Sequence, residues 1–242
     1  MNTIKVKNGK TLMVAHRGCS CVEKENSLAA FIAAGNRSYY GVETDVHRTA
    51  DGEYVCIHDS ETARVASDNI VIEKTSFEYI RSLKLCDIDG TRTRNDIRIP
   101  TLREYIRCCK RYEKHCVLEL KTLYTYENIC EIVDQIIEED YLEHVTFISF
   151  AYDNLLLVKK RLPGHPCQFL TGEYTDDLPE KLAADEMGLD IWYGQINQQN
   201  LDLLHSKGVE VNVWTCDDPA AADALIAMGV DYITSNRLEG EI

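Results

Sequence analysis

The second half of the chain repeats one unit. Short runs rich in β-branched and aromatic residues return about every 21 or 22 residues, and stretches with helical spacing of apolar residues separate them. The runs are Val145–Ser149, Cys167–Thr171, Leu189–Tyr193, Glu210–Trp214 and Asp231–Thr234. Strands that alternate with helices pair in parallel, because each helix carries the chain back to the same edge of the sheet. The repeat therefore predicts a parallel α/β fold.

Capping signals mark the ends of several expected helices. Asp218 followed by proline predicts a helix N-terminus, and Gly229 stands where a C-terminal glycine belongs. Thr101 with Glu104 three residues later has the capping-box pattern and predicts another helix start. The run Val117–Lys121 that follows is a predicted strand.

The first half of the chain contains the same units. We expect strands at Leu12–His16 and Gly41–Val46, joined by a helix at Ser27–Ala34. Leu28, Phe31 and Ile32 share one face of that helix, so this face should pack against the core.

A segment at about 47–100 interrupts the repeat. A turn around Asp51 and a returning strand at Tyr54–His58 predict a hairpin. Further along, Thr75 and Glu78 have capping-box spacing, so the segment should contain at least one helix.

Without the hairpin arm, eight strands are expected along the chain. A closed (β/α)8 TIM barrel pairs eight parallel strands and leaves no exposed edge. We therefore expect residues 1–242 to form one barrel domain that carries the insertion. The alternative is an open doubly wound sheet, but no glycine-rich dinucleotide-binding turn follows the first predicted strand.

Composition narrows the function. The 242 residues carry a formal net charge of -14, which argues against a nucleic-acid partner and against docking on an anionic membrane. The N-terminal lysines precede no apolar segment long enough for a signal peptide or a membrane anchor, so we expect a cytoplasmic protein with mostly reduced cysteines. Cys19 and Cys21 are interpreted as small residues of a tight loop rather than as a metal or redox pair. The oligomeric state cannot be inferred from the sequence.

Acidic residues occur where a barrel carries its reacting groups, near the carboxyl ends of strands. Glu43 and Asp45 are one residue apart and share a strand face, and Glu119 and Lys121 do the same on a later strand. Three carboxylates inside one barrel would repel each other unless a cation compensates. An all-oxygen site suits Mg²⁺ or Ca²⁺ better than zinc. The alternative without a metal is a buried ion-pair network that joins Glu43 to Arg17 and Glu119 to Lys121.

Two histidines should lie beside these carboxylates. His16 ends the first predicted strand, and the hairpin should place His58 roughly opposite Asp45. Together with Arg17 they form a candidate phosphoryl-transfer site in which the histidines move protons. His47 is expected to face outward. The remaining histidines are expected to be incidental, in helices or loops: His115, His144, His165 and His205.

Several spaced motifs carry a family resemblance. They are His16-Arg17-Gly18 with Glu25-Asn26-Ser27, Glu43-x-Asp45-Val46, Val55-x-x-His58-Asp59, Leu118-Glu119-Leu120-Lys121, Val213-Trp214-Thr215 and the final Gly229–Thr234. In this order, from residue 14 to about 236, the chain resembles the glycerophosphodiester phosphodiesterases.

The resemblance implies hydrolysis of small-molecule glycerophosphodiesters to glycerol 3-phosphate and an alcohol. It matches the metal ligands to Glu43, Asp45 and Glu119, the acid–base pair to His16 and His58, and the phosphate contacts to Arg17 and Lys121. We expect the ring of Trp214 to lie against the glycerol or alcohol part of the substrate, with packing inside the barrel as the alternative. One divalent ion, Mg²⁺ or Ca²⁺, is implied. Two departures stand out: Lys24 replaces a usual proline, and Thr234-Ser235-Asn236-Arg237 replaces the usual Thr-Asp-x-Pro.

Three other functions fit parts of the pattern. A phospholipase D-like enzyme acting on lysophospholipids would use the same residues and would need an apolar lip, for which the insertion offers Val65 and Ile70–Ile72 among charged residues. A catalytically silent metabolite-binding barrel would be expected to lack a histidine or a metal ligand. A zinc hydrolase would need histidines at ligand spacing, which the sequence does not contain.

Overall fold

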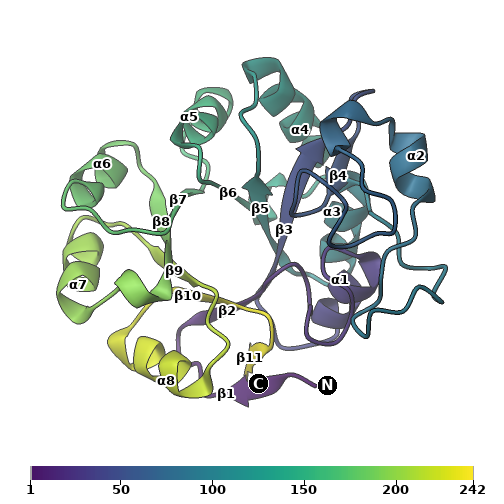
Figure 1. Cartoon of the computed structure of the whole chain (residues 1–242). Coiled ribbons are helices and arrows are strands. Elements are labelled where there is room, and N and C mark those ends of the chain that lie inside the picture. Colours follow the sequence, from purple (N-terminus) through teal and green to yellow (C-terminus); the bar gives the residue numbers. More distant parts are fainter. Residues whose placement is uncertain (1, 242) are drawn as a thin grey trace.

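Eight parallel strands close into a barrel in the computed structural model, which describes residues 2–241 (Figure 1). The strands are β2 (Leu12–Ala15), β3 (Gly41–Arg48), β5 (His115–Leu120), β6 (Val145–Ser149), β7 (Cys167–Thr171), β8 (Gly188–Trp192), β9 (Val211–Trp214) and β10 (Tyr232–Ser235). Each pairs with the next, and β2 closes the ring by pairing with both β3 and β10. The predicted (β/α)8 barrel is confirmed, and the open sheet is excluded.

Within residues 2–241, seven helices surround the strands (Figure 1). They are α1 (Leu28–Gly35), α3 (Leu102–Arg111), α4 (Tyr126–Glu138), α5 (Tyr152–Arg161), α6 (Leu178–Ala184), α7 (Gln198–Ser206) and α8 (Pro219–Met228). The predicted capping box of Thr101 and Glu104 is formed, with both reciprocal hydrogen bonds. Asp218 caps α8, which ends at Gly229 with φ 96°, a left-handed conformation that glycine adopts at little cost.

The buried face of α1 differs from the prediction at one position. Phe31 is 1% exposed and packs edge-on against Tyr105 of α3, with ring centroids 5.0 Å apart. Ile32 is 44% exposed, so its expected burial was wrong. The apolar arc is instead completed by Ala30 and Ala34, whose small side chains lie against the core.

The segment between β3 and α3 forms a hairpin and a small satellite core. Its strand β4 (Tyr54–Cys56) pairs antiparallel with β3, and the 3₁₀ turn η1 (Ile72–Lys74) and α2 (Phe77–Ser82) follow. The predicted helix is present, but the expected capping box was wrong. Ser76 is the N-cap, and the Thr75 hydroxyl donates to the Val71 carbonyl instead.

A two-stranded parallel pair joins the terminal regions and was not predicted. Strand β1 (Ile4–Val6) pairs with β11 (Leu238–Gly240), close to α8 (Figure 1). No helix within residues 2–241 combines the length and the apolar character needed to cross a bilayer.

Candidate active site

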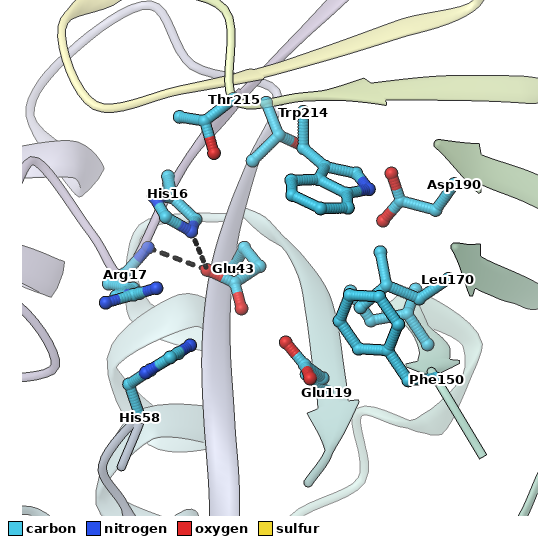
Figure 2. A pocket seen from close by; sticks show the side chains of 12 residues that line it. His16, Arg17, Glu43, His58, Glu119, Phe150, Leu170, Asp190, Trp214 and Thr215 are labelled. Carbon is cyan, nitrogen blue, oxygen red and sulfur yellow. Dashed lines mark hydrogen bonds and ion pairs between the residues drawn. The ribbon is translucent and has the colours of Figure 1, made fainter. Parts of the chain in front are cut away.

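A pocket opens where the barrel strands end, and most of the predicted site residues line it. Twelve side chains line this pocket (Figure 2): His16, Arg17, Glu43, His58, Glu119, Ile148, Phe150, Leu170, Asp190, Trp214, Thr215 and Thr234. Two predicted site residues are not part of this lining. Asp45 lies next to Glu43 and Glu119, which are, and Lys121 pairs with Glu119 and Asp45. The structure therefore brings together side chains from β3, β5, β9 and the segment after β2 that are up to about two hundred residues apart in the sequence.

Three buried carboxylates form an acidic cluster. Glu43, Asp45 and Glu119 are 3%, 1% and 7% exposed, and one oxygen from each lies within 4.8 Å of the others. They come from β3 and β5, which pair so that Asp45 is opposite Glu119. It is the one group of three or more potential metal ligands found among residues 2–241, and all its ligands are oxygens, which disfavours the zinc alternative.

The three carboxylates strongly perturb each other's pKa values. Burial raises the pKa of Glu43 well above its ordinary value, and the charges of Asp45 and Glu119 raise it further. Burial and the charge of Asp45 raise the pKa of Glu119 to about 7. Burial alone would raise the pKa of Asp45 as well, but Lys121 and Arg17 hold it at about 2. Without an added cation, the cluster resists carrying three negative charges.

Two cationic side chains border this acidic cluster. Lys121 Nζ lies 2.8 Å from Glu119 Oε1 and 3.3 Å from Asp45 Oδ1. The Arg17 backbone N–H donates to Glu43 Oε2 at 2.8 Å, and its guanidinium lies 3.5 Å from Asp45 Oδ2. The expected Glu119–Lys121 pair is thus present, whereas Arg17 meets Glu43 through its backbone. Glu25 anchors the Arg17 guanidinium at 3.0 Å.

His16 is held through its Nδ1 atom. The Asn236 Oδ1 atom lies 2.8 Å from His16 Nδ1, and the Asn236 Nδ2 atom donates to Asp217 Oδ2 at 2.6 Å. Because the amide nitrogen is committed to Asp217, the oxygen faces His16 and accepts the Nδ1 proton. In neutral His16 the lone pair therefore lies on Nε2, which is 4.0 Å from Glu43 Oε2. Burial and the nearby Arg17 charge lower the pKa of His16.

His58 is held by a carboxylate rather than an amide. Its Nδ1 lies 2.6 Å from Asp59 Oδ1, and Arg64 Nε donates to the other Asp59 oxygen at 2.7 Å. The hairpin register differs by one residue from the expected alignment, because Ile57, not His58, hydrogen-bonds Asp45. His58 lies two residues beyond the end of β4 at Cys56, and it still reaches the pocket (Figure 2).

Two other histidines are not where we expected them. His47 does not face outward: it is 2% exposed, and its Nε2 lies 3.2 Å from the His58 carbonyl oxygen. The strand β3 continues to Arg48, so His47 shares the inward face with Glu43 and Asp45. His115 begins β5 instead of lying in a helix or loop, at the opposite end of the barrel from the pocket.

The pocket has two chemically different halves (Figure 2). His16, Arg17, Glu43 and His58 form one side, and apolar side chains form the other, including Phe150, whose ring meets Trp214 edge-on at 5.8 Å. Trp214 was predicted at the site.

Sequence reasoning missed two polar groups near the site. Asn26 Nδ2 donates to Asp45 Oδ2 at 2.7 Å, and Asp190 lines the apolar half of the pocket. Asp190 stands between Leu189 and Ile191 in β8, an alternation that signals an inward polar side chain.

The insertion supplies no apolar lip from the residues proposed for one. Val65 and Ile72 are buried in a small core together with Ile80 and Ile99, and Ile70 packs against it. Cys19, which was interpreted as a small residue of a tight loop, is buried. Burial raises the pKa of its thiol to about 12, which disfavours a reactive thiolate.

The fold and the pocket together define a class of protein. Barrels of this kind carry their reacting groups at the carboxyl ends of the strands. An acidic cluster beside cationic side chains and two histidines suits the hydrolysis of phosphate esters. The class is that of barrel phosphodiesterases.

Comparison with known proteins gives the family. Residues 16–239 match the model of the glycerophosphoryl diester phosphodiesterase family. A glycerophosphodiester phosphodiesterase of Caldanaerobacter subterraneus is 30% identical over 95% of this chain and 96% of its own length. The structure of an Oleispira antarctica phosphodiesterase, in complex with the product sn-glycerol-3-phosphate, matches with TM-score 0.82 and 27% identity, covering 93% of both chains. A Parabacteroides distasonis glycerophosphodiester phosphodiesterase matches with TM-score 0.77 and 28% identity, covering 94% of this chain and 93% of its own.

This chain belongs to the glycerophosphoryl diester phosphodiesterase family, and it is a phosphoric diester hydrolase.

Proposed function

We propose that the protein hydrolyses glycerophosphodiesters to glycerol 3-phosphate and an alcohol, with a divalent metal ion at the acidic cluster and His16 and His58 as proton carriers. The observation that supports this most is that both histidines line one pocket together with Glu43 and Glu119, which share the acidic cluster with Asp45. The substrate class follows the printed names of the relatives, one of which was solved with sn-glycerol-3-phosphate bound.

The acidic cluster fits a hard divalent cation. Asp45 Oδ1 is buried without a hydrogen bond from residues 2–241, although Lys121 Nζ lies 3.3 Å away. Mg²⁺ or Ca²⁺ would be held by Glu43, Asp45 and Glu119, because both ions prefer carboxylate oxygens. When bound, such an ion neutralises phosphate charge and polarises the phosphorus–oxygen bonds.

The hydrogen bonds of the two histidines suggest their roles. His16 is the base: Asn236 holds its Nδ1 proton, so Nε2 removes the proton from the attacking hydroxyl. His58 is the acid: Asp59 stabilises the imidazolium, whose Nε2 gives its proton to the leaving alcohol oxygen.

The proposed reaction has two steps, and each histidine ends the second step in its starting protonation state. In the first, the glycerol hydroxyl next to the ester attacks phosphorus, the bond to the alcohol breaks, and a cyclic phosphate forms. In the second, His58 removes a proton from water, which opens the ring, and His16 returns its proton to the glycerol oxygen. Arg17 and Lys121 bind phosphate oxygens, and Trp214 packs against the organic part.

The test is hydrolysis of glycerophosphocholine and glycerophosphoethanolamine by protein stripped with EDTA, with Mg²⁺ or Ca²⁺ added back separately. We expect metal-dependent release of glycerol 3-phosphate, and a loss of at least ~100-fold in His16→Ala and in His58→Ala. His205→Ala is the matched control, because this histidine pairs with Asp231 on the surface. Absence of diester turnover by folded, metal-loaded protein would contradict the proposal.

One observation favours a second substrate class. Leu123, Phe150 and Trp192 are 78%, 52% and 43% exposed, and they follow or end β5, β6 and β8 at the mouth of the barrel. Exposed apolar side chains there would suit the acyl chain of a lysophospholipid. Faster cleavage of lysophosphatidylcholine than of glycerophosphocholine in the same assay would support this phospholipase D-like activity.

A further inference from the structure

Two polar groups in the apolar half of the pocket have no partner. Asp190 is 2% exposed, and its Oδ1 atom has no hydrogen-bond partner within residues 2–241. The buried Trp214 Nε1 likewise finds no acceptor there. Figure 2 shows the indole nitrogen of Trp214 turned toward the carboxyl group of Asp190. Leaving a buried donor or acceptor unpaired costs about 1–3 kcal/mol each, so a bound group is expected to satisfy them.

The neighbouring side chains do not provide a hydrogen bond to Asp190, although they lie beside it in the sheet. Asn212 is opposite Asp190 in the β8–β9 register, and it bonds Gln168 and Thr234 instead. On the β7 side the register partner is Leu170, which is apolar. Asp190 and Trp214 both line the pocket, and their unpaired atoms, Asp190 Oδ1 and Trp214 Nε1, do not belong to a completed hydrogen-bond network of residues 2–241.

The chemistry of the two atoms selects the ligand. A hydroxyl group can accept from Trp214 Nε1 and also exchange a hydrogen bond with the Asp190 carboxyl. An ammonium group of an alcohol such as ethanolamine has no acceptor, so it would leave Trp214 Nε1 unpaired. A phosphate would face the Asp190 oxygens. Burial raises the pKa of Asp190 well above its ordinary value, which suits a neutral hydroxyl partner.

The position of Asp190 in the pocket indicates which substrate hydroxyl it binds. Asp190 lies deep, whereas Phe150 is 52% exposed at the mouth. The alcohol part differs between glycerophosphodiesters, so it needs the open side of the pocket. The glycerol arm is the same in all of them, so it fits the closed side. Of its two free hydroxyls, the one next to the ester is needed at phosphorus, which leaves the terminal one for the deep end.

We propose that Asp190 and the Trp214 indole N–H bind the terminal hydroxyl of the glycerol arm, and so select glyceryl esters over esters that lack this hydroxyl. This assignment rests on the function proposed above. It makes Asp190 a specificity-determining residue.

The experiment compares two substrates with the same leaving group, 4-nitrophenyl glycerol 3-phosphate and 2-hydroxypropyl 4-nitrophenyl phosphate. Both keep the neighbouring hydroxyl, and only the first has the terminal one. The metal-loaded wild-type protein should prefer the glyceryl ester by about 10-fold or more in kcat/KM. Asp190→Ala and Trp214→Phe should each reduce this preference to about 3-fold or less, mainly through the glyceryl ester.

Leu170→Ala is the matched control, because it trims the same part of the pocket without removing a polar group. It should slow both substrates alike and keep the preference. If Asp190→Ala does not fold, Trp214→Phe still tests the pair, and the isosteric Asp190→Asn should retain the preference. No preference in the wild type, or an unchanged preference in both variants, would overturn the assignment. Failure of the wild type to cleave either ester would instead contradict the proposed function.

Discussion

Replacing Asn236 with alanine should slow the reaction through the base, His16. The Asn236 amide holds the proton on His16 Nδ1 and is itself fixed by Asp217, so Nε2 keeps its lone pair. Without this acceptor, neutral His16 can place its proton on Nε2 instead, and that tautomer cannot act as a base toward the pocket.

The size of the effect follows from the hydrogen bond. Losing one partner of a partly buried hydrogen bond costs about 1–3 kcal/mol, and about 1.4 kcal/mol corresponds to a factor of ten in rate. We expect kcat for glycerophosphocholine to fall about 10-fold in Asn236→Ala. KM should change less, because Asn236 does not line the pocket formed within residues 2–241.

The pH profile separates this effect from a general loss of structure. A base must be deprotonated, so activity rises with pH through the pKa of His16. The bond to Asn236 raises that pKa, against burial and Arg17, which lower it. Asn236→Ala should therefore move the acidic limb of kcat to lower pH. Asn236→Asp places a negative charge beside His16, which favours the imidazolium and moves the limb to higher pH.

The control is Asn69→Ala, which removes an exposed asparagine that pairs with Glu61, and it should leave both kcat and the pH profile unchanged. Shifts of the acidic limb in the same direction for the two Asn236 variants, or no shift in either, would refute the reasoning.

Three further predictions follow from individual contacts. Because the pKa of Glu119 is raised to about 7, the metal-free protein should lose stability as pH rises from about 4.5 through 7. Mg²⁺ or Ca²⁺ should therefore raise Tm more at pH 8 than at pH 6. Equal Tm shifts at both pH values would contradict this prediction. Asp59→Asn should lower kcat about 10-fold for glycerophosphocholine but little for the 4-nitrophenyl ester, whose leaving group needs no acid; equal losses would exclude the assigned acid role of His58. Phe31→Ala should lower the unfolding free energy by about 3–5 kcal/mol in urea titrations, whereas Ile32→Ala should change it by less than about 0.5 kcal/mol; similar losses would show that the packing of α1 is misjudged.

Local periodicity was enough to predict the barrel and the shared strand face of two carboxylates. The alternation of Glu43 and Asp45 along one strand identified their shared face, because that face depends only on the two-residue period. The error at His47 has the same origin: the strand was taken to end at Val46, and it continues to Arg48. One misplaced strand end reversed the expected direction of a side chain.

Contacts between distant segments could not be predicted in this way. Asn236 reaches His16 across 220 residues, because β10 pairs with β2 where the barrel closes. No local pattern marks that contact, although the departure from the family motif at this position was visible in the sequence. Likewise Ile32 and Ala34 both fit a helical apolar arc, and the choice between them depends on how α3 packs on α1.

The charges of the site bear on the two interpretations of the acidic cluster. Glu43, Asp45 and Glu119 would carry three negative charges against two positive charges on Arg17 and Lys121, so the ion-pair network alone leaves a surplus of one negative charge. A phosphodiester is an anion, and that surplus would repel it inside a protein whose net charge is already -14. Protonation of one carboxylate removes the surplus negative charge, but the site is then neutral and does not attract the anionic substrate. A divalent cation reverses the sign of the site, so glycerol 3-phosphate should bind the metal-loaded protein in calorimetry and should not bind the EDTA-stripped protein. Equal binding in both states would favour the ion-pair network.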